Sequence, residues 1–366
     1  MVEDVFWPQS SIFFSLMNKK KILLLIPNFG VGGAQRVFSE HSTMLSKHYE
    51  IIECAFNRES HHVYSSCGKS VSLEVPPGNS VATKAIFFVK RCWRLYQIKQ
   101  REDVDITISH MEGANYVNIL SGGKDKKILV VHGSKTAPDS NYTGFLDWIQ
   151  RKVFIPYLLR FADCIVPVSD GIKYELIDIY GISSRKINVI NNSFDIQRIH
   201  RFANELLPPK FRSAFDKTTI AYCGRLAEQK NPIALLKVFA MVRKQKNCQL
   251  LLVGDGHLKN KLVDLAQASG LKVYDNTSSQ NKREIPTDSD VIISGFQSNP
   301  FQFVRSANLF MMSSDFEGFP LALAEAMICG TSVISTDCPT GPRELLAPGT
   351  DVTYQTNEPE ETPYGW

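Results

Sequence analysis

The stretch that decides the fold reads SSDFEGFPLALAEAMICG and occupies residues 313–330. An apolar run with the composition of a buried strand, ANLFMM, precedes it. Pro320 is typical of a first helical turn and Gly330 of a helix end, so the pattern predicts a strand, a loop and a helix. Glu317 then lies in the loop, while Glu325 lies about one turn inside the helix with its side chain tilted back toward the helix start. We expect both carboxylates to face one small volume.

The start of this helix is suited to an anion. The backbone N–H groups of the first turn, around Phe319, Leu321 and Ala322, have no acceptor within the helix and point beyond its N-terminal end. The helix dipole adds to their attraction for negative charge. A ligand with hydroxyl groups and phosphates would therefore fit the volume shared by Glu317 and Glu325. For two acids in isolation, a solvated loop acid and a helix-surface acid are the favoured alternative, so the interpretation depends on the other motifs.

The two acids, separated by seven residues within EGFPLALAEAMICG, resemble the signature of the retaining glycosyltransferases of family 4. The resemblance implies an α/β protein with the GT-B fold, in which two Rossmann-like, doubly wound parallel-sheet domains face a cleft. It also implies transfer of a sugar from a nucleotide diphosphate to an acceptor. Glu317 would be catalytic and contact the donor sugar, and Glu325 would hold the ribose hydroxyls. The remaining donor contacts implied in this segment are Gly318, Phe319, Pro320 and Leu321.

Length and composition describe an ordinary folded protein large enough for two α/β domains. The 366 residues are 43% hydrophobic and 21% charged, which excludes a disordered chain. The eight cysteines are scattered and indicate neither a disulfide framework nor a zinc site, which fits a reducing cytosol. No apolar run approaches the roughly 18 to 20 residues that span a bilayer. Glu3 and Asp4 stand where a secretory signal would carry positive charge, so we expect a cytoplasmic protein.

A glycine-rich turn follows the first apolar run of the chain. PNFGVGGAQR, at residues 27–36, leads into an amphipathic helix, and Gly32 and Gly33 let the backbone approach a diphosphate at the helix start. A dinucleotide-binding site of an oxidoreductase, with Glu53 as its ribose acid, is one alternative. Gln35 argues against it, because the GxGxxG motif requires a glycine there. The GGAxR form is similar to the family 4 loop that closes over the donor phosphates.

Further strands alternate with helical segments and predict a parallel sheet with ligands at the C-terminal ends of its strands. His132 follows one strand in a VHG context, and in family 4 a histidine in this context lies beside the donor sugar. The resemblance therefore assigns His132 a catalytic role, with a hydrogen-bonded histidine of no chemical role as the alternative. For His110, at a similar edge, we favour that alternative. The predicted strands of this domain include 51–56, 104–109, 127–131, 164–168 and a last one within 186–195.

The second domain opens with a strand that leads to GRLAEQKNP. Arg225 and Lys230 lie between this strand and the next helix, at the edge where ligands bind. Two cations there suit a diphosphate leaving group, since arginine binds it through paired hydrogen bonds and lysine as a point charge. The corresponding pair in family 4 has this role, whereas surface ion pairing is the alternative. The resemblance also places Phe296 near the nucleotide base.

The resemblance covers residues 18–350 and sets the expected domain limits. Residues 1–17 read as a non-native or disordered extension, with Met17 as an alternative start. An acceptor-side domain is expected over 18–198 and a nucleotide-sugar-binding domain over 199–366. Family 4 enzymes usually continue for several more helices, so the second domain looks truncated at its C-terminal end. An inactive remnant that at most binds nucleotide sugar is therefore an alternative function.

Residues 84–101, KAIFFVKRCWRLYQIKQR, hold six basic residues and no acid. As a helix they would form a cationic, aromatic face that contacts anionic lipid as a peripheral membrane segment, or an ordinary amphipathic helix. No recognised nucleic-acid-binding module accompanies them, so nucleic acid is not an expected partner. The expected partners are a nucleotide-sugar donor and a lipid-linked or oligosaccharide acceptor.

The predicted function is that of a hexosyl- or N-acetylhexosaminyl-transferase, with a UDP-sugar as the favoured donor. The predicted process is bacterial envelope polysaccharide synthesis, such as O-antigen or capsule, at the inner face of the cytoplasmic membrane. A soluble transferase that forms a disaccharide or a glycogen-like product is an alternative. No Asp-x-Asp motif stands where a donor site is expected, so we expect neither an obligatory metal nor another cofactor.

Overall fold

The computed structural model describes residues 19–57, 64–134, 155–278 and 284–366. These residues form two compact units. The first consists of the described parts of 1–132, 140–167 and 176–190, and the second of those of 133–139, 168–175 and 191–366. Each unit holds a six-stranded sheet whose neighbouring strands all pair in parallel. The predicted α/β fold class, with two parallel sheets, is therefore confirmed.

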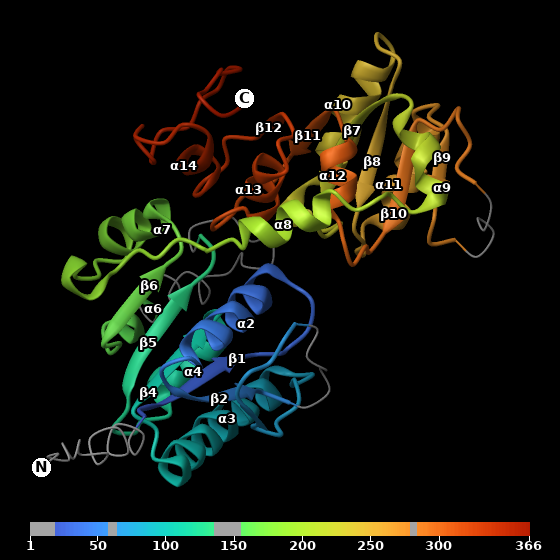
Figure 1. The fold of residues 1–366 in the computed structure, drawn as a ribbon. Coiled ribbons are helices and arrows are strands. Elements are labelled where there is room, and N and C mark those ends of the chain that lie inside the picture. Colours follow the sequence, from blue (N-terminus) through green and yellow to red (C-terminus); the bar gives the residue numbers. More distant parts are fainter. Residues whose placement is uncertain (1–18, 58–63, 135–154, 279–283) are drawn as a thin grey trace, which may run out of the picture. The chain divides into compact units, whose positions relative to one another are not determined.

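The first sheet has the strand order β3-β2-β1-β4-β5-β6 (Figure 1). Leu23, Leu24 and Leu25 of β1 are fully buried, as expected of a parallel strand covered on both faces. Phe38 of α2 packs on one face of the sheet, while Leu95 of α3 packs on the other together with residues of α4. The elements are β1 (Lys21–Ile26), α2 (Gly33–Leu45), β2 (Glu50–Ala55), β3 (Lys69–Ser72), α3 (Val81–Glu102), β4 (Ile106–His110), α4 (Glu112–Leu120), β5 (Lys126–Val131), α6 (Ile155–Leu159), β6 (Cys164–Pro167) and η3 (Ser184–Lys186).

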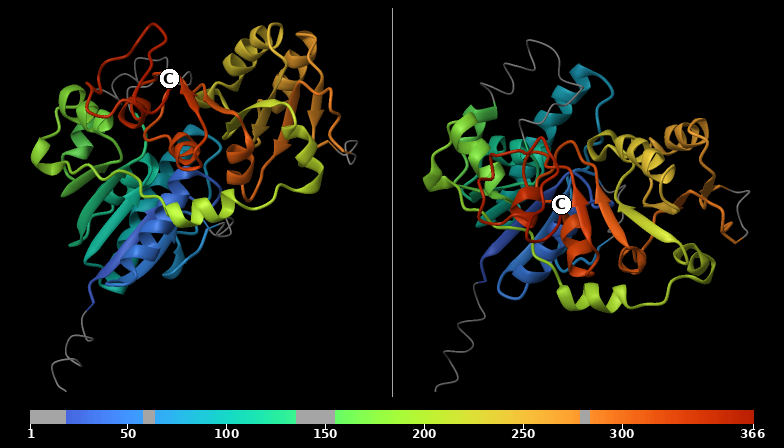
Figure 2. Two further views of the ribbon diagram at one scale, coloured as in Figure 1. Left: turned by 45° about the horizontal axis from the view of Figure 1, so that its top comes forward. Right: turned by 90° about the horizontal axis from the view of Figure 1, so that it is seen from above.

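The second sheet has the order β12-β11-β7-β8-β10-β9. Leu250 and Leu252 of β8 pack with α10 and α11, whereas Leu251 and Val253 pack on the opposite face with α9 and α12. This alternation follows the two-residue period of a strand. Figure 2 shows helices of this unit on both faces of its sheet. The elements are α7 (Asp170–Tyr174), α8 (Ile196–Ala203), α9 (Pro209–Arg212), η4 (Ser213–Phe215), β7 (Thr218–Cys223), η5 (Glu228–Lys230), α10 (Pro232–Arg243), β8 (Cys248–Val253), α11 (Lys259–Ala268), β9 (Val273–Asp275), β10 (Val291–Gly295), α12 (Phe301–Ser306), β11 (Leu309–Met312), α13 (Leu321–Ile328), β12 (Val333–Ser335) and α14 (Pro342–Leu346).

Residues 168–175 belong to the second unit although they follow β6 of the first. The carboxylate of Glu344 accepts the backbone N–H groups of Asp170 and Gly171 at 2.8 and 2.9 Å. A side chain at Gly171 would lie 3.0 Å from Thr340, so the two segments are in close contact. These contacts join the start of α7 to α14 and to the loop before it. The turn η2 (Glu175–Ile179) then continues from α7 as a π-helical segment.

The predicted strands of the first domain are mostly confirmed. The expected strands at 51–56, 104–109, 127–131 and 164–168 correspond to β2, β4, β5 and β6. The prediction of a strand within 186–195 was wrong, because only Ile187 forms an isolated parallel bridge, with Ile165. β3 was not predicted, since its four residues, KSVS, are exposed or half-buried and lack an apolar run.

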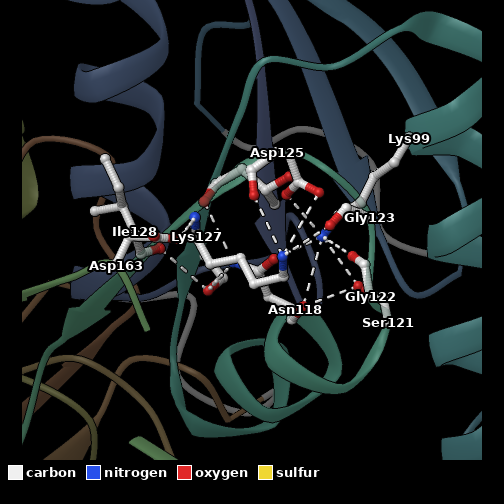
Figure 3. Close-up of polar contacts among 11 residues, drawn as sticks. Lys99, Asn118, Ser121, Gly122, Gly123, Asp125, Lys127, Ile128 and Asp163 are labelled. Atoms are coloured by element: carbon white, nitrogen blue, oxygen red, sulfur yellow. Dashed lines mark hydrogen bonds and ion pairs between the residues drawn. The ribbon is translucent and has the colours of Figure 1, made fainter. Parts of the chain in front are cut away.

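A buried ion pair lies where the strands of the first sheet begin (Figure 3). Lys99 of α3 places its Nζ 2.9 Å from Oδ2 of Asp125, the residue before β5, and both side chains are 1% exposed. The same Nζ donates to Asn118 Oδ1 at 2.9 Å and to Ser121 Oγ at 3.0 Å. Lys127 Nζ lies 3.8 Å from the other oxygen of Asp125. The cluster therefore ties α3 to the loop that joins α4 and β5.

Candidate active site

The loop before α13 presents the helix start that the sequence predicted, with one correction. The helix begins at Leu321, so Pro320 is the residue before it and not part of its first turn. The Pro320 backbone is extended at ψ 93°, and its carbonyl accepts the N–H of Leu323 at 3.1 Å. A side chain at Gly341 would lie 2.5 Å from the Pro320 ring, so the following loop packs tightly there. Helix geometry leaves the N–H groups of Leu321 and Ala322 without an intrahelical acceptor.

Glu317 lies in this loop and is only 5% exposed. Its Oε1 accepts hydrogen bonds from Lys230 Nζ and Ser314 Oγ, both at 2.5 Å. Its backbone carbonyl accepts the hydroxyl of Thr340 and the N–H of Ser134, so the main chain is held from two sides. Both side-chain bonds end on Oε1. Within the described residues, Oε2 therefore remains available to a ligand hydroxyl.

Lys230 is held opposite Glu317 by hydrogen bonds between two loops. The Ser313 hydroxyl donates to the Lys230 carbonyl at 2.9 Å. The N–H of Asp315 donates to the Gln229 carbonyl at 2.9 Å, and the Gln229 amide donates to the Phe316 carbonyl at 3.0 Å. The Lys230 side chain is 21% exposed. The lysine is therefore positioned by its own main chain, while its ammonium group still reaches solvent.

Arg225 follows β7 on a turn that is tightly fixed. The Tyr222 hydroxyl donates to the Arg225 carbonyl at 2.8 Å, and the next N–H, of Leu226, donates to the Asp255 carbonyl at 2.9 Å. The Arg225 side chain is exposed, and within the described part of the chain its guanidinium forms no ion pair. A rigid turn thus carries a cation that is free to bind an anion.

Glu325 lies half-buried on α13. Burial and, to a lesser extent, the Glu325 carboxylate raise the pKa of the Cys223 thiol to about 12, although Lys230 opposes the shift. Cys223 is the last residue of β7 and packs against a cluster that includes Leu323 and Ala326 of α13. The structure thus brings Glu317 and Lys230 into contact beyond the C-terminal end of β7, and it places Glu325 on α13.

The other predicted residues of the second unit lie on nearby turns. Phe296 follows β10 and is 61% exposed. Gly295 adopts φ +76°, and a side chain there would lie 2.6 Å from Thr277 Cγ2, so a glycine is required for this turn. The ring of Phe319 lies 6.4 Å from that of Phe194, centroid to centroid. Gly318 is buried in the same loop.

The glycine loop of the first unit is folded around Gln35. Gly32 precedes α2, and Gly33 is the first residue of that helix. The Gln35 amide donates to Asn28 Oδ1 at 3.1 Å. A side chain at Gly32 would meet the Gln35 carboxamide, which would then have to move away from Asn28. Gln35 therefore has a structural role in the loop that the GxGxxG comparison did not reveal.

Glu53 is not placed to hold a ribose, as the oxidoreductase alternative requires. Its buried carboxylate accepts hydrogen bonds from the hydroxyls of Ser42 and Ser66. It also accepts the backbone N–H groups of Cys67 and Gly68, at 3.1 and 3.3 Å. Four donors of its own chain therefore occupy this carboxylate, and its function is to hold the loop before β3.

Three histidines gather at the C-terminal edge of the first sheet. His110 ends β4 and is fully buried, and its Nδ1 lies 3.0 Å from Nε2 of the half-buried His132. The His41 ring, from α2, lies 5.2 Å from the His110 ring. Burial lowers the pKa of His132 to about 3, with a smaller contribution from His41. The sequence placed His132 and His110 at this edge but gave no sign of their contact or of His41.

The described residues contain no group of three or more His, Cys, Asp or Glu side chains that is placed to hold a metal ion. Among the described helices, none combines the length and the apolar character needed to cross a bilayer.

Comparisons with known proteins identify the class. Two family models match: Glycosyltransferase Family 4 over residues 31–198, and Glycosyl transferases group 1 over residues 217–362. An uncharacterized glycosyltransferase of Methanocaldococcus jannaschii is 30% identical over 294 residues, which cover 76% of this chain and 66% of that protein. The Campylobacter jejuni N-acetylgalactosamine-N,N'-diacetylbacillosaminyl-diphospho-undecaprenol 4-alpha-N-acetylgalactosaminyltransferase is 25% identical over 328 residues, 89% of this chain and 83% of that protein.

The fold comparison agrees with the family. The Anabaena protein HepE, solved in complex with UDP and glucose, superposes with a TM-score of 0.65 at 17% identity, over 90% of this chain and 83% of that one. The fold is therefore GT-B. The chain belongs to the family 4 glycosyltransferases.

Proposed function

We propose that this glycosyltransferase transfers a hexosyl or N-acetylhexosaminyl group from a nucleoside diphosphate sugar to a lipid-linked or saccharide acceptor. The observation that carries the proposal is the Lys230–Glu317 pair beside the start of α13. A buried carboxylate there accepts hydrogen bonds from sugar hydroxyls, whereas a partly exposed cation and free helix amides attract phosphates. UDP is the favoured nucleotide, and HepE, which shares the fold, was solved with UDP and glucose.

The proposed process is bacterial envelope polysaccharide synthesis at the inner face of the cytoplasmic membrane. The Campylobacter relative is named for N-acetylgalactosamine transfer to a sugar on diphospho-undecaprenol. A lipid-linked acceptor of that kind lies in a membrane, so an enzyme that uses it works at the membrane surface. This part of the proposal depends on the relative and on the surface of α3.

In the proposed reaction, the bond between the anomeric carbon and the diphosphate oxygen breaks. The acceptor hydroxyl oxygen bonds to that carbon, and its proton passes to the departing diphosphate. Negative charge grows on the leaving group, so nearby cations lower the barrier. Arg225 is exposed, and Lys230 needs only to exchange Glu317 for a phosphate oxygen. Because these cations supply the positive charge, we propose no obligatory metal.

We propose that the acceptor attacks from the face that the diphosphate leaves, so that the anomeric configuration is retained. Glu317 holds a hydroxyl of the donor sugar through Oε2, and Glu325 holds the ribose. His132 contacts the donor sugar from the first unit, and Phe296 lies by the base. A proton NMR spectrum of the product tests the stereochemistry, since a retaining enzyme gives an α-linked product from an α-linked donor.

Thermal unfolding with UDP-, GDP- and ADP-sugars tests donor binding. A donor at one hundred times its Kd stabilises the native state by about 2.7 kcal/mol, so its melting temperature rises. We expect a rise with one nucleotide class, lost in Glu325→Ala and in Arg225→Ala. Lys237→Ala, at an exposed position of α10, is the matched control and keeps the rise. A cooperative transition that no nucleotide sugar shifts would contradict the proposal and favour the inactive remnant.

The surface of α3 supports membrane contact, but through fewer cations than the sequence suggested. Arg91 donates to the Pro76 carbonyl at 2.8 Å, Arg94 to the Leu73 carbonyl at 2.6 Å, and Lys99 is buried. Three of the six cations therefore serve the fold. Four exposed apolar residues lie at helical spacing on one face, and they are Ile86, Val89, Trp93 and Tyr96.

We propose that this apolar stripe, with the exposed Lys90 beside it, rests on an anionic membrane. Sedimentation with vesicles that contain anionic lipid tests the contact. Ile86→Gln/Trp93→Gln is expected to reduce the bound fraction several-fold. Val238→Gln/Met241→Gln removes exposed apolar side chains from α10 and serves as the control. Equal binding by both double variants would contradict a role for α3.

A further inference from the structure

The three histidines of the first unit form a connected group. The rings of His110 and His132 are stacked at 25°, with centroids 5.2 Å apart, and Nδ1 of His110 lies 3.0 Å from Nε2 of His132. Phe38 meets the His110 ring edge to face at 5.4 Å. Three rings thus surround His110: the imidazoles of His132 and His41 and the phenyl ring of Phe38. The ring of His110 is therefore held in one orientation.

All three imidazoles are neutral near pH 7. Burial keeps the pKa of His110 well below its ordinary value, and the neighbouring His132 and His41 lower it further. Burial also lowers the pKa of His41. A neutral imidazole carries one N–H and one acceptor nitrogen. The 3.0 Å contact therefore holds a single proton, on either His110 Nδ1 or His132 Nε2.

The surroundings of His110 decide where that proton lies. Its other nitrogen, Nε2, is buried, and the described part of the chain gives it no hydrogen-bond partner. A proton on Nε2 would leave a buried N–H unpaired, and such groups are rarer in proteins than unpaired acceptors. The favoured arrangement puts the proton on His110 Nδ1, which donates to His132 Nε2. His132 must then carry its own proton on Nδ1.

We propose that His110 is a positioning residue that fixes His132 as the Nδ1–H tautomer. His132 thereby presents a neutral N–H donor, suited to the oxygen of a sugar hydroxyl. The use of that donor on the nucleotide sugar rests on the proposed function, whereas the tautomer itself does not. In this arrangement His132 orients a hydroxyl and does not transfer protons near neutral pH.

Long-range proton–nitrogen NMR correlation on the full chain, labelled with ¹⁵N-histidine, tests the tautomer. The ring signals of His132 are assigned from their loss in His132→Gln. In the unmodified protein we expect Nδ1 protonated and Nε2 unprotonated. His110→Phe keeps a ring but removes the donor, so the His132 signals should move toward the Nε2–H form. His110→Asn restores an N–H near the former Nδ1 and should restore the Nδ1–H form.

His48→Phe replaces an exposed histidine of the same unit and should leave the His132 signals unchanged. An Nε2–H form in the unmodified protein would overturn the proposal, even if no variant folds. Unchanged His132 signals in a folded His110→Phe would overturn it as well.

A kinetic measurement separates this proposal from the proposed function. If His132 contacts the donor, His110→Phe should raise the donor KM about tenfold, the worth of roughly one hydrogen bond, and His110→Asn should recover most of the loss. A changed tautomer with an unchanged donor KM would uphold the positioning by His110. That outcome would instead remove His132 from the proposed donor site.

Discussion

The Lys99–Asp125 pair of the first unit and the Lys230–Glu317 pair of the second differ chiefly in their contact with solvent. Both side chains of the first pair are 1% exposed, whereas Lys230 is 21% and Glu317 6% exposed. Lys99 is also enclosed by Asn118 and Ser121. The Lys99–Asp125 pair, called the enclosed pair below, therefore has no space in which to exchange partners. In the Lys230–Glu317 pair, the partly exposed Lys230 can exchange Glu317 for a phosphate. The enclosed pair therefore stabilises the fold, whereas the Lys230–Glu317 pair takes part in the proposed chemistry.

Replacement of Lys99 should give the largest effect on stability. Lys99→Met leaves the buried Asp125 charge with only the more distant Lys127 as a cation, and the loss of one partner of a buried pair typically costs about 3 to 5 kcal/mol. Urea denaturation should show this loss in the free energy of unfolding. Lys99→Met/Asp125→Leu removes both charges and should recover most of it. A single replacement that costs less than about 1 kcal/mol would show that the enclosed pair is not structural.

Replacement of Lys230, in contrast to that of Lys99, should reduce catalysis strongly and stability only slightly. Lys230→Met removes a cation from the proposed leaving-group site, so kcat should fall about 100-fold or more. Because the pair is partly exposed, the free energy of unfolding should change by only about 1 kcal/mol. Lys237→Met, on the exposed side of α10, should change neither quantity. If Lys230→Met destabilised the protein as strongly as Lys99→Met, the contrast between the two pairs would be lost.

The sequence could predict which edge of each sheet carries the site, but not which groups pair there. The inner strands are apolar runs because both faces of a parallel sheet are covered, so their positions can be read directly. β3 lies at the sheet edge and is half-exposed, and it lacks that signal. The spacing of Glu317 and Glu325 indicated one shared volume. The Lys230–Glu317 contact depends on the Ser313 hydroxyl bond to the Lys230 carbonyl, which joins distant parts of the chain.

The cations of α3 also show that the sequence does not reveal which side chains pair in the folded protein. Their pattern in the sequence does not distinguish Arg91 and Arg94, which bind backbone carbonyls of the preceding loop, from the exposed Lys84 and Lys90. Tertiary contacts determine which of these side chains are exposed. The arginines bind the loop because one guanidinium can donate to several carbonyls at once. The histidine group is a similar case, since His41, His110 and His132 come from three separate elements.

The pH dependence of stability should show the smallest effect, and it tests the protonation state of Lys99 in the enclosed pair directly. Burial lowers the pKa of Lys99 from 10.5 to about 8, although the Asp125 carboxylate opposes this shift. Between these values the unfolded chain binds the Lys99 proton and the folded protein does not. The free energy of unfolding should therefore rise with pH from about 8 toward 10.5, by about 1 kcal/mol per pH unit from this group.

The difference between the unmodified protein and Lys99→Met isolates this contribution, because the other titrating groups are common to both. The unmodified protein should gain stability relative to the variant as the pH is raised from 8 to 10, in urea denaturation at each pH. The control Lys237→Met should follow the unmodified protein. A difference that is constant with pH would mean that Lys99 keeps its proton in the folded state, and that Asp125 compensates fully for the burial of its charge.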